Sequence, residues 1–370
     1  MSLVKRDNNS EIFFALVKAG LWGKEVRLSE FGKPDFKRIH LMAREQSVTG
    51  LVTSGLEYVS DIQIDESDST PFLQEILMEE GRNSKINRFV AKLFGYLAEN
   101  GVKAVLIKGQ GVAQCYLKPL WRTVGDVDLF LDEENYQKAK AVLVPTANHV
   151  DQEVENKRHL AMILGSHAVE LHGVMHTYVS RRVDAVVDEV QKDIFSNRGV
   201  RYWDDGGTSI PLPSPDNDVI IIFTHFIGHF YVGGMGLRQI SDWCRLLWTY
   251  KDEIDRDLLG KRLNAMKLMP EWEAFAAFAV ELLDMPAEAM PFYNVSAKNT
   301  RRALKIQSLM LHTGNFGHNR DESYHRSASK LIVKIRVFFH RFGEFIRLFT
   351  IFPSNTPKFE SSMKTFVFGV

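Results

Sequence analysis

The sequence contains very little cysteine, since Cys115 and Cys244 are the only two among its 370 residues. Two cysteines exclude a disulfide-rich scaffold and a thiolate metal cluster. They fit a reducing compartment, so we expect a cytoplasmic protein. The N-terminal residues lack an apolar run followed by a small-residue cleavage site, and no secretory signal is therefore expected.

An excess of charge of one sign is also missing, because 46 Lys and Arg side chains balance 46 Asp and Glu side chains. A chain without net charge has no overall field that attracts DNA, so we expect no DNA partner and only a local phosphate site. Apolar runs such as Val219 to Phe223 are far shorter than the roughly 20 residues that cross a bilayer. The sequence therefore predicts no transmembrane segment.

What the chain does contain is typical of a globular protein with a sizeable core. Hydrophobic residues make up 45% of it and charged residues 25%. Helical periodicity runs through the first hundred residues, where Ser84 is the expected cap of the last helix and Asn100-Gly101 its end. At this length we expect two or three packed units rather than one binding module.

The pattern changes to short strands between residues 102 and 173. We expect strands at 102–109 and 126–131, with a helix after each, and then two strands joined by a turn at Gly165-Ser166, at 159–164 and 167–173. Strand and helix alternate at first, and a hairpin follows. These elements predict a small mixed sheet.

Helical periodicity returns after Val174, and it indicates four further helices, at 183–194, 217–231, 237–250 and 271–283. We interpret Ile210 to Asp218 as an exposed proline-rich connector and a domain hinge. Residues 301–370 carry twelve basic and four acidic side chains. In this basic tail one apolar helix face is expected to dock on the protein's own core. A membrane-surface helix is the alternative. The residues of the apolar face are Leu331, Ile335, Phe338, Phe342, Phe345 and Phe349.

Together these patterns predict an α+β fold in which a small mixed-sheet core is flanked by N- and C-terminal helical segments. The expected divisions are an N-terminal helical segment at 1–100, a sheet core at 101–180, a helical domain at 181–300 and the basic tail at 301–370.

Chemistry is concentrated between Lys108 and Leu131. Side chains alternate along a strand, so Asp126 and Asp128 point to the same side, and Glu170 lies on a strand that we expect to be a neighbour. Carboxylates held close together repel unless a divalent cation neutralises them, and oxygen ligands suit Mg²⁺ or Mn²⁺. The alternative is a turn whose exposed acids bind nothing.

Groups suited to phosphate lie beside these acids. Lys108 and Gly109 end one strand and open a helix whose free N–H groups can receive phosphate, and Gly109 and Gly111 permit close backbone approach. Arg122 adds a fixed cation on the same loop as the acids. Acids for metal beside bases for phosphate are typical of metal-dependent phosphoryl transfer.

The ordered elements Lys108-Gly109, Arg122, Gly125-Asp126-x-Asp128 and Glu170-Leu171-His172 resemble the bacterial uncharacterised nucleotidyltransferase family, a branch of the polymerase-β-like superfamily. The resemblance extends to a pattern in the following helices that would line the cleft together with His172; its residues are His225, His229, Arg238 and Asp242.

The resemblance implies two metal ions, Mg²⁺ or Mn²⁺, held by Asp126, Asp128 and Glu170. It implies transfer of a nucleoside monophosphate from an NTP to an unidentified hydroxyl acceptor, which is a small molecule, a protein or RNA. In this mechanism Glu170 binds the metal that activates the acceptor and takes its proton, while Lys108 and Arg122 neutralise the phosphates.

The chain departs from the superfamily at the first helix, where a Gly-Ser or Gly-Gly pair usually holds the triphosphate. It reads Lys108-Gly109-Gln110-Gly111 here, so Lys108, Gln110 or backbone amides must hold the phosphates. This departure favours the first alternative, a nucleotide-binding regulator with weak or no turnover. A second alternative is a helical scaffold in which the acids are incidental.

Overall fold

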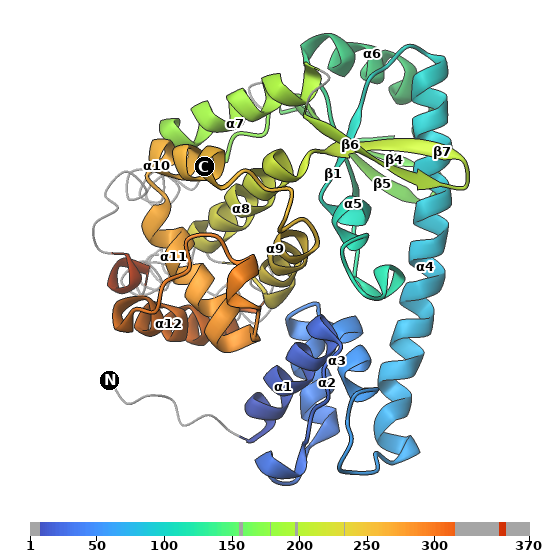
Figure 1. Cartoon of the computed structure of the whole chain (residues 1–370). Coiled ribbons are helices and arrows are strands. Elements are labelled where there is room, and N and C mark those ends of the chain that lie inside the picture. The colour runs from blue at the N-terminus through green and yellow to red at the C-terminus, as the bar shows by residue number, and fades with distance from the viewer. Residues whose placement is uncertain are drawn as a thin grey trace, which may run out of the picture.

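The computed structural model describes residues 8–154, 158–177, 179–196, 199–232, 234–314 and 348–352. These residues form an α+β fold with a mixed sheet between helical segments, as predicted (Figure 1). The helices and strands follow one another along the chain as α1 (Asn8–Trp22), α2 (Phe36–Glu45), α3 (Thr49–Leu56), α4 (Glu66–Glu99), β1 (Val105–Ile107), α5 (Gly109–Ala113), β2 (Val127–Phe130), α6 (Glu133–Leu143), β3 (His149–Val150), β4 (His159–Leu164), β5 (His167–His172), α7 (Arg181–Phe195), β6 (Val200–Asp205), β7 (Thr208–Pro213), α8 (Pro215–Val232), α9 (Leu237–Thr249), α10 (Arg256–Met266), α11 (Met269–Ala277) and α12 (Ala297–Thr313).

Helix α4 is the longest element, at 34 residues, and it runs from the α1–α3 cluster to the sheet (Figure 1). The predicted helix start at Ser84 is wrong, because Ser84 lies in the middle of α4. The predicted end is confirmed: Asn100 is the C-terminal cap, and Gly101 follows with a φ of 67° that glycine adopts without strain.

The five-stranded sheet has the order β1-β2-β5-β4-β3. Strands β2 and β5 are parallel, and the other neighbours are antiparallel. The hairpin β4–β5 turns at Gly165-Ser166, where Gly165 has a φ of 61°. The mixed sheet predicted from the sequence is confirmed, and its parallel pair is what brings β2 beside β5.

One face of the sheet is apolar and packs against helices α4 and α6. Val127 and Leu129 of β2 lie there with Val169 and Leu171 of β5, in a core that also contains Leu93 of α4. Because side chains alternate along a strand, the residues between them face the other side. That opposite face carries the polar side chains of the site.

Residues 210–218 are not the exposed connector that we expected. Ile210 and Leu212 are buried strand residues of β7, which pairs with β6, and Pro215 is the first residue of α8. Proline suits the first turn of a helix, where its missing N–H costs nothing. The hairpin β6–β7 was missed because two prolines were interpreted as the signal of a connector.

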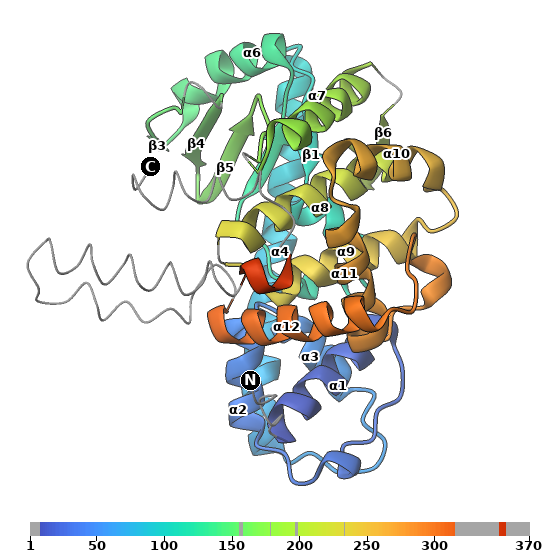
Figure 2. The same ribbon diagram turned by 90° about the vertical axis from the view of Figure 1, so that its left-hand side faces the viewer.

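The helices at the two ends of the chain share one large hydrophobic core, to which the sheet also contributes Val105, Ile107 and Phe130. Gln46, after α2, joins them: its side chain donates to the carbonyl of Met310 in α12 and accepts from the amide of Leu237 in α9. Helix α12 packs against α11 (Figure 2). The four divisions predicted from the sequence stay a prediction.

Among the described residues, no helix is long and apolar enough to span a membrane. The apolar face predicted for the basic tail falls largely on residues 315–347, which lie outside the described residues.

Candidate active site

Three carboxylates meet at the parallel strand pair. Asp128 lies directly opposite Glu170 in the β2–β5 register, and Asp126 precedes β2 by one residue. One ligand oxygen from each of the three lies within 4.8 Å of the others. The structure therefore brings together Asp126 and Asp128, which the alternation of side chains predicted to share one face, and Glu170 of the neighbouring strand.

Lys108 reaches into this group from the end of β1. It has a φ of 55°, an uncommon conformation for a non-glycine residue that costs about 1–3 kcal/mol. Its Nζ lies 2.9 Å from Asp128 Oδ1. Burial lowers the pKa of Lys108, but attraction and a hydrogen bond from Asp128, with further attraction from Asp126 and Glu170, raise it above its usual value. Lys108 is therefore a fixed cation at the acid group.

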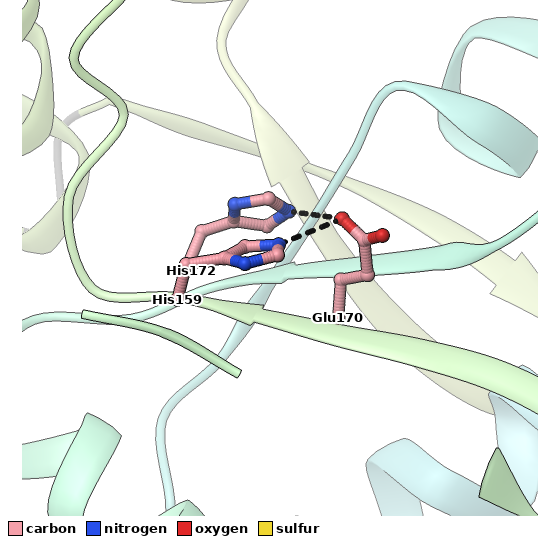
Figure 3. A group of neighbouring side chains, drawn as sticks. All are labelled: His159, Glu170 and His172. Atoms are coloured by element: carbon pink, nitrogen blue, oxygen red, sulfur yellow. Dashed lines mark hydrogen bonds and ion pairs between the residues drawn. The ribbon is translucent and has the colours of Figure 1, made fainter. Parts of the chain in front are cut away.

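Two histidines complete the cluster from the neighbouring strands (Figure 3). The Nε2 of His159 lies 3.0 Å from Glu170 Oε2, and the Nε2 of His172 lies 3.4 Å from the same oxygen. His172 Nε2 also lies 2.7 Å from Asp128 Oδ1. The hydrogen bonds from His159 and His172 lower the pKa of Glu170 to about 2.

The two aspartates differ in how their charge is balanced. Burial would raise the pKa of Asp128, but Lys108 and His172 hold it well below its usual value. Burial raises the pKa of Asp126, and repulsion from Asp128 and Glu170 raises it further. No salt bridge to Asp126 is found in the part of the chain that the structure describes. A bound cation would therefore reduce the repulsion that Asp128 and Glu170 exert on the Asp126 carboxylate.

The acids open onto a cavity of about 590 Å³ between the sheet and helices α8 and α9. His225 and His229 line it from one face of α8, with their ring centroids 4.6 Å apart. Burial and the Lys108 charge lower the pKa of both, to about 4 for His229. Both imidazoles are therefore neutral at neutral pH, and they give the cavity a polar wall without added positive charge.

Arg122 also lines the cavity, but Asp242 of α9 holds its guanidinium. Arg122 Nε lies 2.7 Å from Asp242 Oδ1, and a second guanidinium nitrogen lies 2.7 Å from Oδ2. The hydroxyl of Tyr116 donates to the same Oδ1 at 2.7 Å. This buried pair fixes the loop that leads to Asp126, and its charges neutralise each other.

Further bonds from α4 and α9 hold the same loop. Asn83 in α4 donates to the carbonyls of Leu120 and Arg122, each at 2.8 Å. Arg238 in α9 donates to the carbonyl of Thr123 at 3.1 Å and lines the cavity. The loop before Asp126 is therefore held by helices that come before and after the sheet in sequence.

The predicted phosphate residues are divided between two environments. Lys108 and Gly109 line the cavity. Gln110 is buried, with its amide 3.5 Å from Asn83 Oδ1, and a Cβ on Gly111 would lie only 2.9 Å from Leu212 in β7. Of the four residues from 108 to 111, the structure therefore places two at the cavity and packs the other two against neighbouring elements. Helix α5 has only five residues, so its dipole is weak.

His159 is the site residue that sequence reasoning missed. A two-residue turn at Gly165-Ser166 pairs Leu164 with His167, and this register then pairs His159 with His172. The signal was present in the sequence, because the turn was predicted and the pairing follows from counting back along both strands.

Comparison with known proteins agrees with this geometry. A family model described as "Uncharacterised nucleotidyltransferase" matches residues 32–284, about two thirds of the chain, and the chain belongs to this family. The match includes the sheet, the acid group and the cavity wall. No curated protein and no solved structure matches the chain.

Proposed function

We propose that this member of the uncharacterised nucleotidyltransferase family transfers a nucleoside monophosphate from an NTP to a hydroxyl acceptor, in a reaction that depends on divalent metal. One observation carries the proposal: Asp126, Asp128 and Glu170 bring oxygens within 4.8 Å of one another at a cavity of about 590 Å³. Carboxylates at the mouth of a large polar cavity are the setting in which metal-assisted phosphoryl transfer occurs.

The residues present fit divalent metal. Three carboxylate oxygens are ligands suited to Mg²⁺ or Mn²⁺. Asp126 has its pKa raised by burial and by the other two acids, and this repulsion is relieved by a cation. When bound, two such ions would neutralise the triphosphate and lower the pKa of the acceptor hydroxyl.

The protein's own groups would position the substrates and move one proton. Glu170, whose pKa is about 2, is ionised at neutral pH and would accept the proton of the attacking hydroxyl. Lys108 would turn from Asp128 to the phosphates once metal balances that acid, since its Nζ is already at the acid group. Arg122, through its pair with Asp242, would keep Asp126 in place.

The acceptor would enter the cavity beside α8. Its wall carries neutral His225 and His229 together with Thr224 and Met175, which suits a polar acceptor. A small molecule, an exposed protein side chain and an RNA hydroxyl all offer the required nucleophile.

A second candidate is a regulator that binds nucleotide without turnover. The chain has no serine after Gly109, Gln110 is directed toward Asn83, and Gly111 packs against Leu212. These contacts leave Lys108 and the backbone near Gly109 to hold a triphosphate, and binding with poor alignment for transfer follows naturally from so few groups.

Thermal unfolding with each NTP tests binding. A ligand that binds only the folded state at 100 times its Kd stabilises it by about 2.7 kcal/mol. We expect a higher melting temperature with one NTP plus Mg²⁺ or Mn²⁺ and a smaller change with either alone. No shift under any combination would favour a scaffold.

Transfer is tested by incubating the protein with α-labelled NTP, Mg²⁺ and cell lysate fractions. The enzyme moves label onto an acceptor, and Glu170→Gln loses this transfer while keeping much of its nucleotide binding. Thermal stabilisation by NTP without label transfer to small molecules, protein or RNA would support the regulator.

A further inference from the structure

We infer that His159, Glu170 and His172 form a site for a borderline transition-metal ion, with Zn²⁺ as its natural occupant, next to the three carboxylates. Only a catalytic use of this ion would rest on the proposed function. The binding site itself follows from side chains of β4 and β5 and is tested without nucleotide.

The backbone places the three groups on one face. His159 is directly opposite His172 across the antiparallel β4–β5 pair, and Glu170 is two residues before His172 on the same strand. Residues two apart on a strand share a face, and opposed residues have neighbouring Cβ atoms. Valine and leucine at 169 and 171 anchor the other face in the core.

The distances match those between the ligands of a tetrahedral zinc ion. Zinc binds nitrogen and oxygen at about 2.0–2.2 Å, so two ligands of one tetrahedral ion lie about 3.3 Å apart. The Nε2 atoms of His159 and His172 lie 3.0 Å and 3.4 Å from Glu170 Oε2. The three ligand atoms lie within 4.8 Å of one another.

The donor set differs from that of the three carboxylates. Imidazole nitrogen suits zinc and its transition-metal neighbours, whereas carboxylates alone suit Mg²⁺ and Mn²⁺. Three protein ligands leave one position of a tetrahedral ion open, as in catalytic zinc sites. His159 and Glu170 are 29% and 28% exposed, so a fourth ligand can reach the ion from the cavity.

Other histidine–carboxylate pairs in the described chain lack this convergence. Each joins one histidine to one acid: His40 to Glu75, His149 to Asp151 and His176 to Asp188. At Glu170 two imidazoles meet one oxygen. In addition, His172 Nε2 faces oxygens of both Asp128 and Glu170, and its single proton can serve only one of them well.

The test is a titration of the metal-free, full-length protein with Co²⁺, a spectroscopic substitute for Zn²⁺, in the absence of NTP. Four-coordinate Co²⁺ absorbs visible light far more strongly than the octahedral ion, so the absorbance reports both binding and geometry. We expect strong absorbance that Zn²⁺ abolishes and excess Mg²⁺ does not. His159→Ala and His159→Gln should each weaken Co²⁺ binding by at least about tenfold, since even outer-shell partners of metal ligands have effects of that size.

His176→Ala is the matched control, because His176 lines the same cavity and its Nε2 lies 2.8 Å from Asp188 Oδ1. It should bind Co²⁺ as the parent does. Parental affinity and absorbance in both His159 variants would overturn the inference. Loss of Co²⁺ binding in Asp126→Asn with parental binding in His159→Ala would also overturn it, because the ion would then lie on the three carboxylates.

Nucleotide binding is scored separately by thermal shift with NTP and Mg²⁺. If the parent protein shows no thermal shift with NTP and Mg²⁺ but its Co²⁺ binding depends on His159, the proposed function is refuted and the metal site is supported. The reverse pattern, a shift with NTP and Co²⁺ binding that is indifferent to His159, would refute the metal site alone.

Discussion

The buried pair Arg122–Asp242 gives the most direct prediction about what holds the site together. Asp242→Asn keeps the size of the side chain and removes its charge. Arg122 and Asp242 are only 7% and 5% exposed, so the guanidinium that remains is largely shielded from water. Removing one partner of such a pair costs about 3–5 kcal/mol.

Repulsion between Arg122 and Arg238 adds to the cost of removing Asp242. Asp242 attracts both guanidiniums, and the nearby Arg122 contributes, after burial, to lowering the pKa of Arg238. The hydroxyl of Tyr116 also donates to Asp242. We therefore expect Asp242→Asn to lower the free energy of unfolding by about 4 kcal/mol.

Urea denaturation followed by circular dichroism measures this loss. Glu134→Gln is the control, because the Glu134–Lys138 pair is exposed and such pairs contribute about 0–1 kcal/mol. The double variant Arg122→Met, Asp242→Leu should recover most of the stability, since hydrophobic replacement of a buried pair is often neutral. A loss in Asp242→Asn no larger than that of Glu134→Gln would refute the reasoning.

Three further predictions concern the acids. Asp126→Asn should abolish metal-dependent stabilisation yet raise the metal-free melting temperature slightly. The pKa of Asp126 is raised in the folded protein, so ionisation of this side chain destabilises the fold as pH rises. An unchanged metal-induced shift in a thermal melt would contradict this prediction. Asp128→Asn should instead lower metal-free stability by about 3 kcal/mol, because it leaves Lys108 buried without its partner; a urea titration that shows no loss would contradict this. Glu170 has its pKa lowered to about 2, so it stabilises the metal-free fold above its unfolded value of 4.5 and this contribution is lost as pH falls toward 2. The stability difference between parent and Glu170→Gln should therefore shrink over that interval, and a constant difference in urea titrations from pH 5 to pH 3 would be evidence against it.

The sequence predicted those parts of the fold that depend on short-range pattern. The apolar run before the Gly165-Ser166 turn placed β4 at His159–Leu164 without error, and the alternation of side chains along a strand put Asp126 and Asp128 on one face. Those features need only the pleat of a strand. The same reasoning failed at β7, where Ile210 and Leu212 alternate correctly but Pro211 lies between them and Pro213 follows.

Long-range contacts were beyond such reasoning. The family resemblance placed Asp242 in the cleft lining, but nothing local indicates that it meets Arg122, 120 residues earlier. Ser84 was expected to cap a helix because serine often does, but the apolar contacts of α4 on both sides of Ser84 continue the helix through it. Tertiary packing overrode local preference in both cases.

The core shared by the two ends of the chain has a consequence for synthesis on the ribosome. Helix α1 buries Phe13 and Leu16 in a core that also needs Trp272 and Ile306. At about 5–20 residues per second, the ribosome takes roughly 15–60 s to deliver those later residues. The smaller core between the sheet, α4 and α6 draws on residues 86–212 and can form first. The N-terminal helices, although made first, are thus among the last to be covered, and during that interval their apolar faces are open to chaperones.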